Sequence, residues 1–226
     1  DSEYGSVRRV SSRGGRSQLL SEQPGHYREL AVSPDGKTLV VRRARGGNLL
    51  APEFGERPGI YQMPASGGDL TLVTDNGSGA HFADRNDQLY LLRSGKADGA
   101  PSQELVRVNL QGHDATTIAS SAFASDMRVA PDARHLLFRE QYQIYVAALP
   151  RTGKVIKMGP EADAVPLQRL SAIGGEYPSF SSAGKVHWSI GPTFKSVALA
   201  TAFAEDFTPP GDGINLSQRV PSDKPA

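Results

Sequence analysis

A short turn sequence recurs along this chain at a nearly constant interval, and this period limits the possible fold more than any other feature. The turn is most complete at residues 33–37, Ser-Pro-Asp-Gly-Lys, where proline presets φ, aspartate can bond its own backbone and glycine accepts a positive φ. Looser versions begin at Ala83, Ala130 and Ser181, so the starting residues are 50, 47 and 51 positions apart. We name these four segments the marker turns. A period of about 20–50 residues is typical of a repeat architecture.

Each interval between marker turns contains four strand candidates, separated by glycine pairs or other turn residues. Two short strands around Gly14-Gly15 precede the first complete set, and in the first set Leu30 and Val32 fall on one face of a strand. The predicted strands are 7–10, 18–21, 27–32, 38–42, 60–63, 70–74, 81–83, 89–92, 105–110, 116–119, 127–130, 136–138, 144–146, 167–171, 176–181 and 186–189. No segment combines sustained helical periodicity with capping residues, although 198–207 fits a short helix as well as an edge strand. The sequence therefore predicts an all-β fold.

A four-stranded antiparallel unit of ~40–50 residues, repeated along a chain, is typical of the blades of a β-propeller. The predicted units are a partial one at 1–21, complete ones at 22–74, 75–119 and 120–171, and a partial one at 172–207. Residues 208–226 are rich in proline and glycine and are predicted to be a linker. The two partial units could pair to close a four-bladed ring or belong to a larger, six-bladed-type propeller, and we favour the larger ring.

Composition excludes several classes of protein. The chain has 226 residues, 38% of them hydrophobic and 22% charged, with a net charge of +1 and no cysteine. The absence of cysteine rules out disulfides, thiolate metal sites and a cysteine nucleophile. Arginines cluster near the start, at Arg8, Arg9, Arg13 and Arg16, but without interleaved aromatics they indicate a solvated strand face rather than a nucleic-acid site. No apolar run approaches the roughly 18 residues of a membrane-spanning helix.

No catalytic constellation is visible in the sequence. The histidines are His26, His81, His113, His135 and His187, and none stands in the His-x-His or His-Glu-x-x-His spacing of a metal site. Gly77-Ser78-Gly79 lacks the spacing of a serine-hydrolase nucleophile turn. We therefore predict no catalytic, cofactor-binding or metal-binding residue in this segment.

The candidate binding site consists of four polar residues, one near the start of the first strand in each of four repeat units. His26, His81, Arg128 and Glu176 could form a polar mouth that binds a peptide or a small ligand, and the alternative is that they are ordinary polar residues at a sheet rim. Trp188 is expected to pack between blades rather than to stack on a ligand.

The turn at 33–37, the Gly-rich link before it and the Ile-Tyr strands followed by Gly-Gly resemble the TolB-type propeller repeat, also called WD40-like or PD40. The resemblance covers roughly residues 7–189. It implies the fold and no particular activity, because such repeats occur in TolB, in the tricorn protease, in prolyl-oligopeptidase-like enzymes and in certain amidohydrolases.

The last third of the chain narrows the resemblance. Leu-Gln-Arg-Leu-Ser at 167–171 and the stretch 174–191 are similar to the final propeller repeat of bacterial amidohydrolases, where segments like 214–216 and 220–225 lead into a metal-dependent hydrolase domain. The resemblance implies a non-catalytic propeller that shapes access to substrate or binds it, in a periplasmic or secreted protein. Zinc or another divalent metal is expected only in that C-terminal domain, which would be a partner of the propeller. The alternatives are a stand-alone TolB-like propeller that binds a protein or peptide and, more weakly, the propeller of a prolyl-oligopeptidase-like peptidase.

Overall fold

The computed structural model describes residues 5–44, 57–181, 184–211 and 213–215. Within these residues the chain is all-β except for one short helix, α1 (Leu199–Ala202), as predicted. It forms two compact units, Asp1–Ala122 with Thr152–Lys157, and Phe123–Arg151 with Met158–Ala226. Each unit contains two of the four larger sheets.

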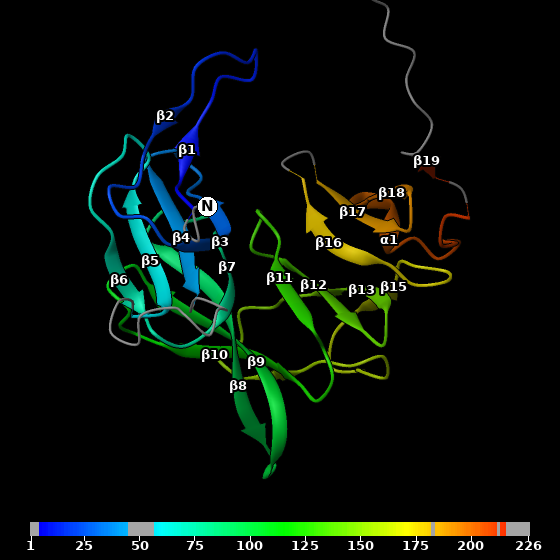
Figure 1. The fold of residues 1–226 in the computed structure, drawn as a ribbon. Helices are drawn as coiled ribbons and strands as arrows, with labels where there is room; N and C mark the ends of the chain where they lie inside the picture. The colour runs from blue at the N-terminus through cyan, green and yellow to red at the C-terminus, as the bar shows by residue number, and fades with distance from the viewer. Residues whose placement is uncertain (1–4, 45–56, 182–183, 212, 216–226) are drawn as a thin grey trace, which may run out of the picture. The chain divides into compact units, whose positions relative to one another are not determined.

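The first unit begins with a two-stranded ribbon and a four-stranded antiparallel sheet whose strands lie side by side (Figure 1). The ribbon pairs β1 (Arg8–Arg9) with β2 (Gln18–Leu19), on either side of the predicted turn at Gly14 and Gly15. The sheet contains, in order, β3 (His26–Val32), β4 (Thr38–Ala44), β5 (Gly59–Pro64) and β6 (Thr71–Thr74). These elements agree with the strands predicted from the sequence.

The second sheet of this unit has a fifth strand. Its antiparallel strands are β7 (Ser78–His81), β8 (Gln88–Ala97), β9 (Ala100–Asn109) and β10 (Thr116–Ser121). β8 and β9 form a hairpin that extends past the other strands of the sheet (Figure 1). The additional strand, β14 (Ile156–Lys157), pairs parallel to β10, and Lys157 reaches Asp98 at the hairpin tip at 2.6 Å. The sequence predicted neither β14 nor this departure from an antiparallel sheet.

The second unit contains two four-stranded sheets. One has the order β11 (Asp126–Val129), β12 (His135–Glu140), β13 (Gln143–Ala148) and β15 (Leu167–Arg169). The other has the order β16 (Glu176–Phe180), β17 (Lys185–Ile190), β18 (Thr193–Ala198) and β19 (Ile214–Asn215).

The marker turns join the first strand to the second strand in all four sheets. At the first turn, Ser33 N–H donates to Thr38 O at 2.9 Å, and Gly36, with φ of 72°, donates to Ser33 O at 2.9 Å. At the third turn, Ala130 bonds His135 and Ala133 in the same way, and Ala133 takes the positive φ of 54°. The same local chemistry therefore closes turns that differ in sequence.

A repeated hydrogen bond links each marker turn to the third strand of its sheet. In all four sheets the residue after the third strand donates its N–H to the carbonyl of the residue before the second strand. The pairs are Ala65 to Lys37 at 2.8 Å, Leu110 to Asp87 at 3.2 Å, Leu149 to Arg134 at 2.7 Å and Leu199 to Gly184 at 2.9 Å. Because the same hydrogen bond occurs in all four sheets, the four sheets are repeats of one four-stranded structural motif.

Apolar clusters join the two sheets within each unit. In the first unit, Val40 and Ile60 of one sheet pack with Leu89 and Leu91 of the other. In the second unit, Trp188 and Val186 pack with Leu137 and Ile144. Face-to-face burial of neighbouring sheets is what stabilises propeller blades, because no single small sheet can bury both of its faces. Leu30 and Val32 do share a face of β3, and that face is exposed.

The last sheet is more complete than the sequence suggested. Two strands were expected there, and the structure adds β18 and β19. Ile214 and Asn215 of β19 lie in the segment assigned to a linker, and Lys195 Nζ binds the carbonyl oxygens of Pro210 and Gly211 at 2.9 and 2.7 Å. This part of the predicted linker is therefore attached to the sheet. Ser182 and Ala183 of the fourth marker turn, and the segment 220–225, lie outside the described residues.

Candidate functional site

The predicted polar residues of the first unit lie in strand β3 and at the end of β7. His26 begins β3 and is partly buried. His81 is only 8% exposed, its Nδ1 lies 2.8 Å from Gly79 O, and its ring stacks on Tyr90 with centroids 5.8 Å apart. His81 is therefore a packed structural side chain.

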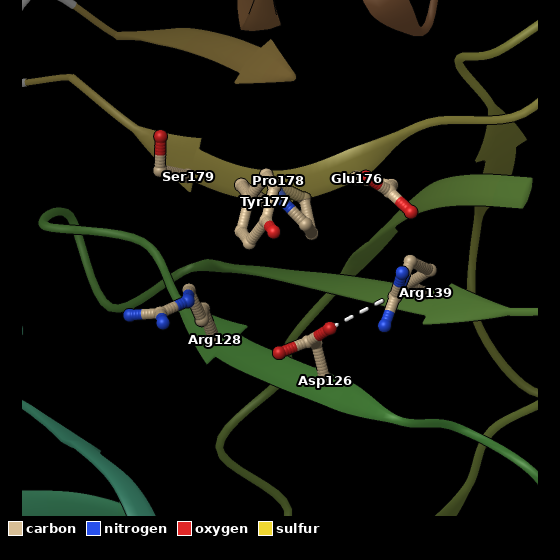
Figure 2. Close-up of a pocket in the computed structure, with 7 residues that line it drawn as sticks. All are labelled: Asp126, Arg128, Arg139, Glu176, Tyr177, Pro178 and Ser179. Carbon is tan, nitrogen blue, oxygen red and sulfur yellow. Dashed lines mark ion pairs between the residues drawn. The ribbon is translucent and has the colours of Figure 1, made fainter. Parts of the chain in front are cut away.

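The structure brings together the two predicted residues of the second unit. Arg128 of β11 and Glu176 of β16 line one pocket of about 560 Å³ (Figure 2). The remaining lining residues are Asp126, Arg139, Tyr177, Pro178 and Ser179. We name this the rim pocket. It lies between the first strands of two neighbouring sheets, with Arg139 contributed by β12.

One ion pair is built into the rim pocket. Asp126 Oδ2 lies 3.1 Å from Arg139 Nε, which also donates to Ser125 Oγ at 3.0 Å. The two side chains of the pair are 33% and 23% exposed, so water screens their attraction only in part. This pair occupies the Arg139 guanidinium and fixes one side of the pocket.

Two other charges in the rim pocket are not neutralised by protein groups. Among the described residues, the Arg128 guanidinium and the Glu176 carboxylate have no ion-pair or hydrogen-bond partner. Figure 2 shows them at opposite ends of the pocket, with Tyr177 and Pro178 between them. The pocket therefore offers a ligand one positively charged hydrogen-bond donor, Arg128, and one negatively charged hydrogen-bond acceptor, Glu176.

Tyr177 combines unusual backbone geometry with high exposure. Its φ is 54°, in a region that residues other than glycine rarely occupy. The residue is 81% exposed to solvent. The pairing of β16 with β17 shifts register between Glu176 and Ser179, which places Tyr177 in a β-bulge. Bulges of this kind redirect side chains beside functional sites.

A second pocket adjoins the first in this unit and shares Glu176 with it. It has a volume of about 420 Å³ and is lined in part by Tyr142, Ile173 and Gly175. Tyr142 and Ile173 are 72% and 73% exposed, so apolar surface borders the charged pocket. Sequence reasoning missed Tyr142, Ile173 and Tyr177. Apolar residues that the structure leaves exposed, such as Tyr142 and Ile173, are typical of a binding surface, but their exposure is not visible in the sequence.

The remaining three histidines lie outside the rim pocket. His113 is exposed, His135 Nδ1 lies 2.8 Å from Asp132 Oδ2, and the His187 ring stacks on Phe194 at 5.2 Å. Among the described residues, no group of three or more His, Asp or Glu side chains is arranged to hold a metal ion. The segment containing Gly77, Ser78 and Gly79 runs into the bulged strand β7.

Trp188 packs in the core of the second unit, as predicted. It is 1% exposed, and a Cβ on Gly175 would lie only 2.3 Å from its Cδ1, so a glycine is needed for the close approach. The clustered arginines of the first unit bind local partners: Arg8 donates to Ser17 and Arg9 to Gln18. In the part of the chain that the structure describes, no helix is long and apolar enough to cross a membrane.

No protein-family model matches the chain. None of the curated proteins matches it either. Solved structures do. A TolB-type protein from Agrobacterium tumefaciens has 19% identity and a TM-score of 0.56, with 83% of this chain and 63% of that chain covered. TolB from Acinetobacter baumannii has 16% identity and a TM-score of 0.60, with 89% and 48% covered.

An oligogalacturonate lyase in complex with manganese also has a similar structure, with 11% identity, a TM-score of 0.55, and 87% of this chain and 57% of that chain covered. The chain thus spans about half to two thirds of the length of these three structures. At such identities the likeness concerns the fold. The repeated sheets, the marker turns and these comparisons together show that the chain has a TolB-like β-propeller fold.

Proposed function

We propose that this chain is a non-catalytic propeller module that binds a peptide-like ligand in the rim pocket. The observation that supports the proposal is the pair of opposite charges, Arg128 and Glu176, which line one pocket without described protein partners. Charged groups without protein partners that line the same pocket are candidates for ligand recognition. Surface charges that only keep a protein soluble do not need to share a pocket.

The pocket chemistry selects the class of ligand. A guanidinium binds a carboxylate, and a carboxylate binds an ammonium or guanidinium, so the ligand should carry both charges. Peptides combine these groups along an extended chain that fits a site between two strands. The apolar surface of Tyr142 and Ile173 beside Glu176 can receive a neighbouring apolar side chain.

Titration of the ¹⁵N-labelled protein with an acetylated, amidated pentapeptide that carries one glutamate and one lysine tests this proposal. We expect saturable amide shifts at residues 126–128 and at Glu176, Tyr177 and Ser179, weakened at high salt because the contacts are charged. The double substitution Arg128→Gln with Glu176→Gln should abolish them. The matched control is Arg134→Gln, which removes an exposed arginine outside the pocket in the same unit. Absence of shifts at the pocket in the unsubstituted protein would reject the proposal.

We further propose that the propeller belongs to a larger, six-bladed-type ring in a periplasmic or secreted hydrolase that resembles the amidohydrolases. The stretch 174–191 and the motif at 220–225 support this, because they are similar to the end of the propeller in such proteins. In this arrangement the propeller repeats include β19 (Ile214–Asn215), the segment after β19 leads to the catalytic domain, and zinc or another divalent metal is held in that domain. The coding sequence downstream of Ala226 provides the test: a barrel-sized domain with an early His-x-His pair is expected, and its absence overturns the proposal.

A stand-alone TolB-like propeller that binds a protein or peptide partner is the second candidate. The likeness to two TolB-type structures favours it. Both candidates predict a ligand in the rim pocket, and the downstream sequence separates them. A downstream domain with Gly-x-Ser-x-Gly in place of His-x-His would instead indicate the weaker third candidate, a prolyl-oligopeptidase-like peptidase.

A further inference from the structure

The fourth residue before each marker turn is Glu29, Gly79, Asp126 or Tyr177, and we name it the bulge position. Glu29, Gly79 and Tyr177 lie in a β-bulge of their strand, whereas Asp126 pairs directly with Arg139 in the regular ladder of β11. In three of the four sheets it carries a positive φ, of 53° at Glu29, 62° at Gly79 and 54° at Tyr177. Each of these three strands shifts register across the bulge position. The bulge is thus present in three of the four first strands and absent from β11.

In the first unit a carboxylate of the protein occupies the space between two neighbouring bulge positions. Glu29 Oε1 pairs with Arg42 at 2.7 Å, and its Oε2 accepts a hydrogen bond from the Gly79 N–H at 2.6 Å. The bulge of one first strand therefore presents a backbone N–H to an acid on the preceding first strand. A backbone N–H bonded to an ionised carboxylate is a strong, charge-assisted contact.

In the second unit Asp126 stands at the same distance before its marker turn as Glu29 but does not make this contact. Asp126 pairs with Arg139 at 3.1 Å, and Arg139 stands at the same repeat position as Arg42. Asp126 lies in the regular ladder of β11 rather than in a bulge and is one methylene shorter than glutamate, and the described structure shows no hydrogen bond from Tyr177 N–H to Asp126. Asp126 and Tyr177 instead line the rim pocket. The space that Glu29 occupies in one unit is open in the other.

The structure assigns to this space the carboxylate of the ligand. Its oxygen accepts a hydrogen bond from the Tyr177 N–H, as Glu29 does from Gly79, and the Arg128 guanidinium neutralises it. This inference rests on the proposed function, and it adds which group of the ligand binds in this space and how the ligand is oriented in the pocket. The carboxylate lies toward Arg128, and the positively charged group of the ligand lies toward Glu176 at the other end of the pocket (Figure 2).

The distribution of arginines in the two units supports this assignment. Glu29 has its own counter-charge in Arg42, so the first unit needs no further cation. In the second unit Asp126 and Arg139 neutralise each other, and Arg128 is an additional cation without a described partner. At the position equivalent to Arg128 the first sheet has Ala31 and the second has His81. The extra positive charge therefore occurs beside the open site.

The assignment is tested by comparing how tightly the protein binds two pentapeptides that are identical except that one has glutamate where the other has glutamine. We expect the glutamate peptide to bind about tenfold more tightly or better, because the carboxylate contact is charge-assisted. Its binding should shift the Tyr177 amide proton downfield. Arg128→Gln should remove the preference for glutamate, Arg128→Lys should keep part of it, and Arg134→Gln should leave it unchanged.

Tyr177→Gly separates the backbone contact from the aromatic ring. Glycine tolerates the positive φ and retains the N–H, so this variant should bind more weakly overall and still prefer the glutamate peptide. Equal binding of the two peptides by the unsubstituted protein overturns the carboxylate assignment while the proposed function stands. Failure of both peptides to bind overturns the proposed function as well.

Discussion

Two hairpin turns of this chain adopt the same backbone geometry with different residues. The loop Asp98-Gly99 has φ values of 52° and 82°, and the loop Gln141-Tyr142 has 47° and 68°. Both are two-residue loops with two positive φ values, the pattern of type I′ turns, which favour glycine at the second position. Tyr142 is thus the strained counterpart of Gly99.

Exchange of residue types at these loops should shift stability in opposite directions. We expect Tyr142→Gly to stabilise the protein by about 0.5–1 kcal/mol and Gly99→Ala to destabilise it by a similar amount, because backbone strain outweighs the change in unfolded-state entropy. Both positions are exposed, so little packing changes. Urea unfolding measures both variants, and a loss of stability in Tyr142→Gly would show that its ring contacts outweigh the strain.

Acid should destabilise the fold through aspartates at its turns. Asp35 Oδ1 accepts hydrogen bonds from Ser33 Oγ at 2.7 Å and Lys37 N–H at 3.0 Å, and these bonds lower the pKa of Asp35. The ion pair with Arg85 lowers the pKa of Asp87, and the one with Lys157 lowers the pKa of Asp98. An aspartate whose pKa is lower in the folded state stabilises the fold at pH values above its unfolded-state pKa. This stabilisation is lost as the pH falls through the folded-state pKa.

The predicted pH window therefore lies below about pH 4, the unperturbed value for aspartate. Urea midpoints measured from pH 7 down to pH 3 should fall most steeply in this window. Asp35→Asn should flatten the dependence, since asparagine does not titrate. An unchanged slope in that variant would contradict the role of Asp35.

At the scale of elements, a buried lysine attaches the end of the described chain to the last sheet. Lys195 is 5% exposed and its ammonium binds two carbonyl oxygens, of Pro210 and Gly211, four residues or fewer before β19. Lys195→Met should reduce stability by about 1–3 kcal/mol, because it leaves these carbonyls without their donor.

Hydrogen exchange of residues 208–215 provides the more specific measurement for Lys195. We expect faster exchange there in Lys195→Met and no change in Lys185→Met, which alters an exposed lysine of the same sheet. Equal protection of the segment in both variants would show that β19 docks without Lys195.

The turns and most strands, including edge strands such as β3 and β11, could be predicted from the sequence, whereas β14, β18 and β19 could not. The marker turns contain proline, aspartate and glycine in positions with a local mechanism, and the strands beside them are rich in β-prone residues. β14 and β19 have two residues each, and each forms only because a neighbouring strand has an unpaired edge. Short strands of this kind carry no local signal.

At the scale of the whole molecule, each unit has its own apolar cluster. Leu89 is fully buried in a cluster of the first unit and Leu137 in the cluster of the second, and the two clusters share no residue. Each substitution to alanine should cost about 2–5 kcal/mol, the usual range for a buried leucine.

The effects of Leu89→Ala and Leu137→Ala should add when they are combined. Residues without shared packing partners usually show additive free energies of unfolding, within about 0.5 kcal/mol. A double-mutant cycle by urea unfolding measures the coupling. A coupling energy well above that limit would show that the two cores stabilise each other.

The fold follows from the sequence, because the period of the marker turns and the strands between them are set by local φ preferences and β propensity. The repeat also places Arg128 and Glu176 at positions that suggest binding. That these two share a pocket, while His81 packs against Tyr90, depends on how the strands pack in three dimensions. The reason is that a pocket depends on how strands pair and where their side chains reach: Glu29 leaves a bulge and reaches the Gly79 N–H, whereas Asp126 lies in regular strand pairing and binds Arg139.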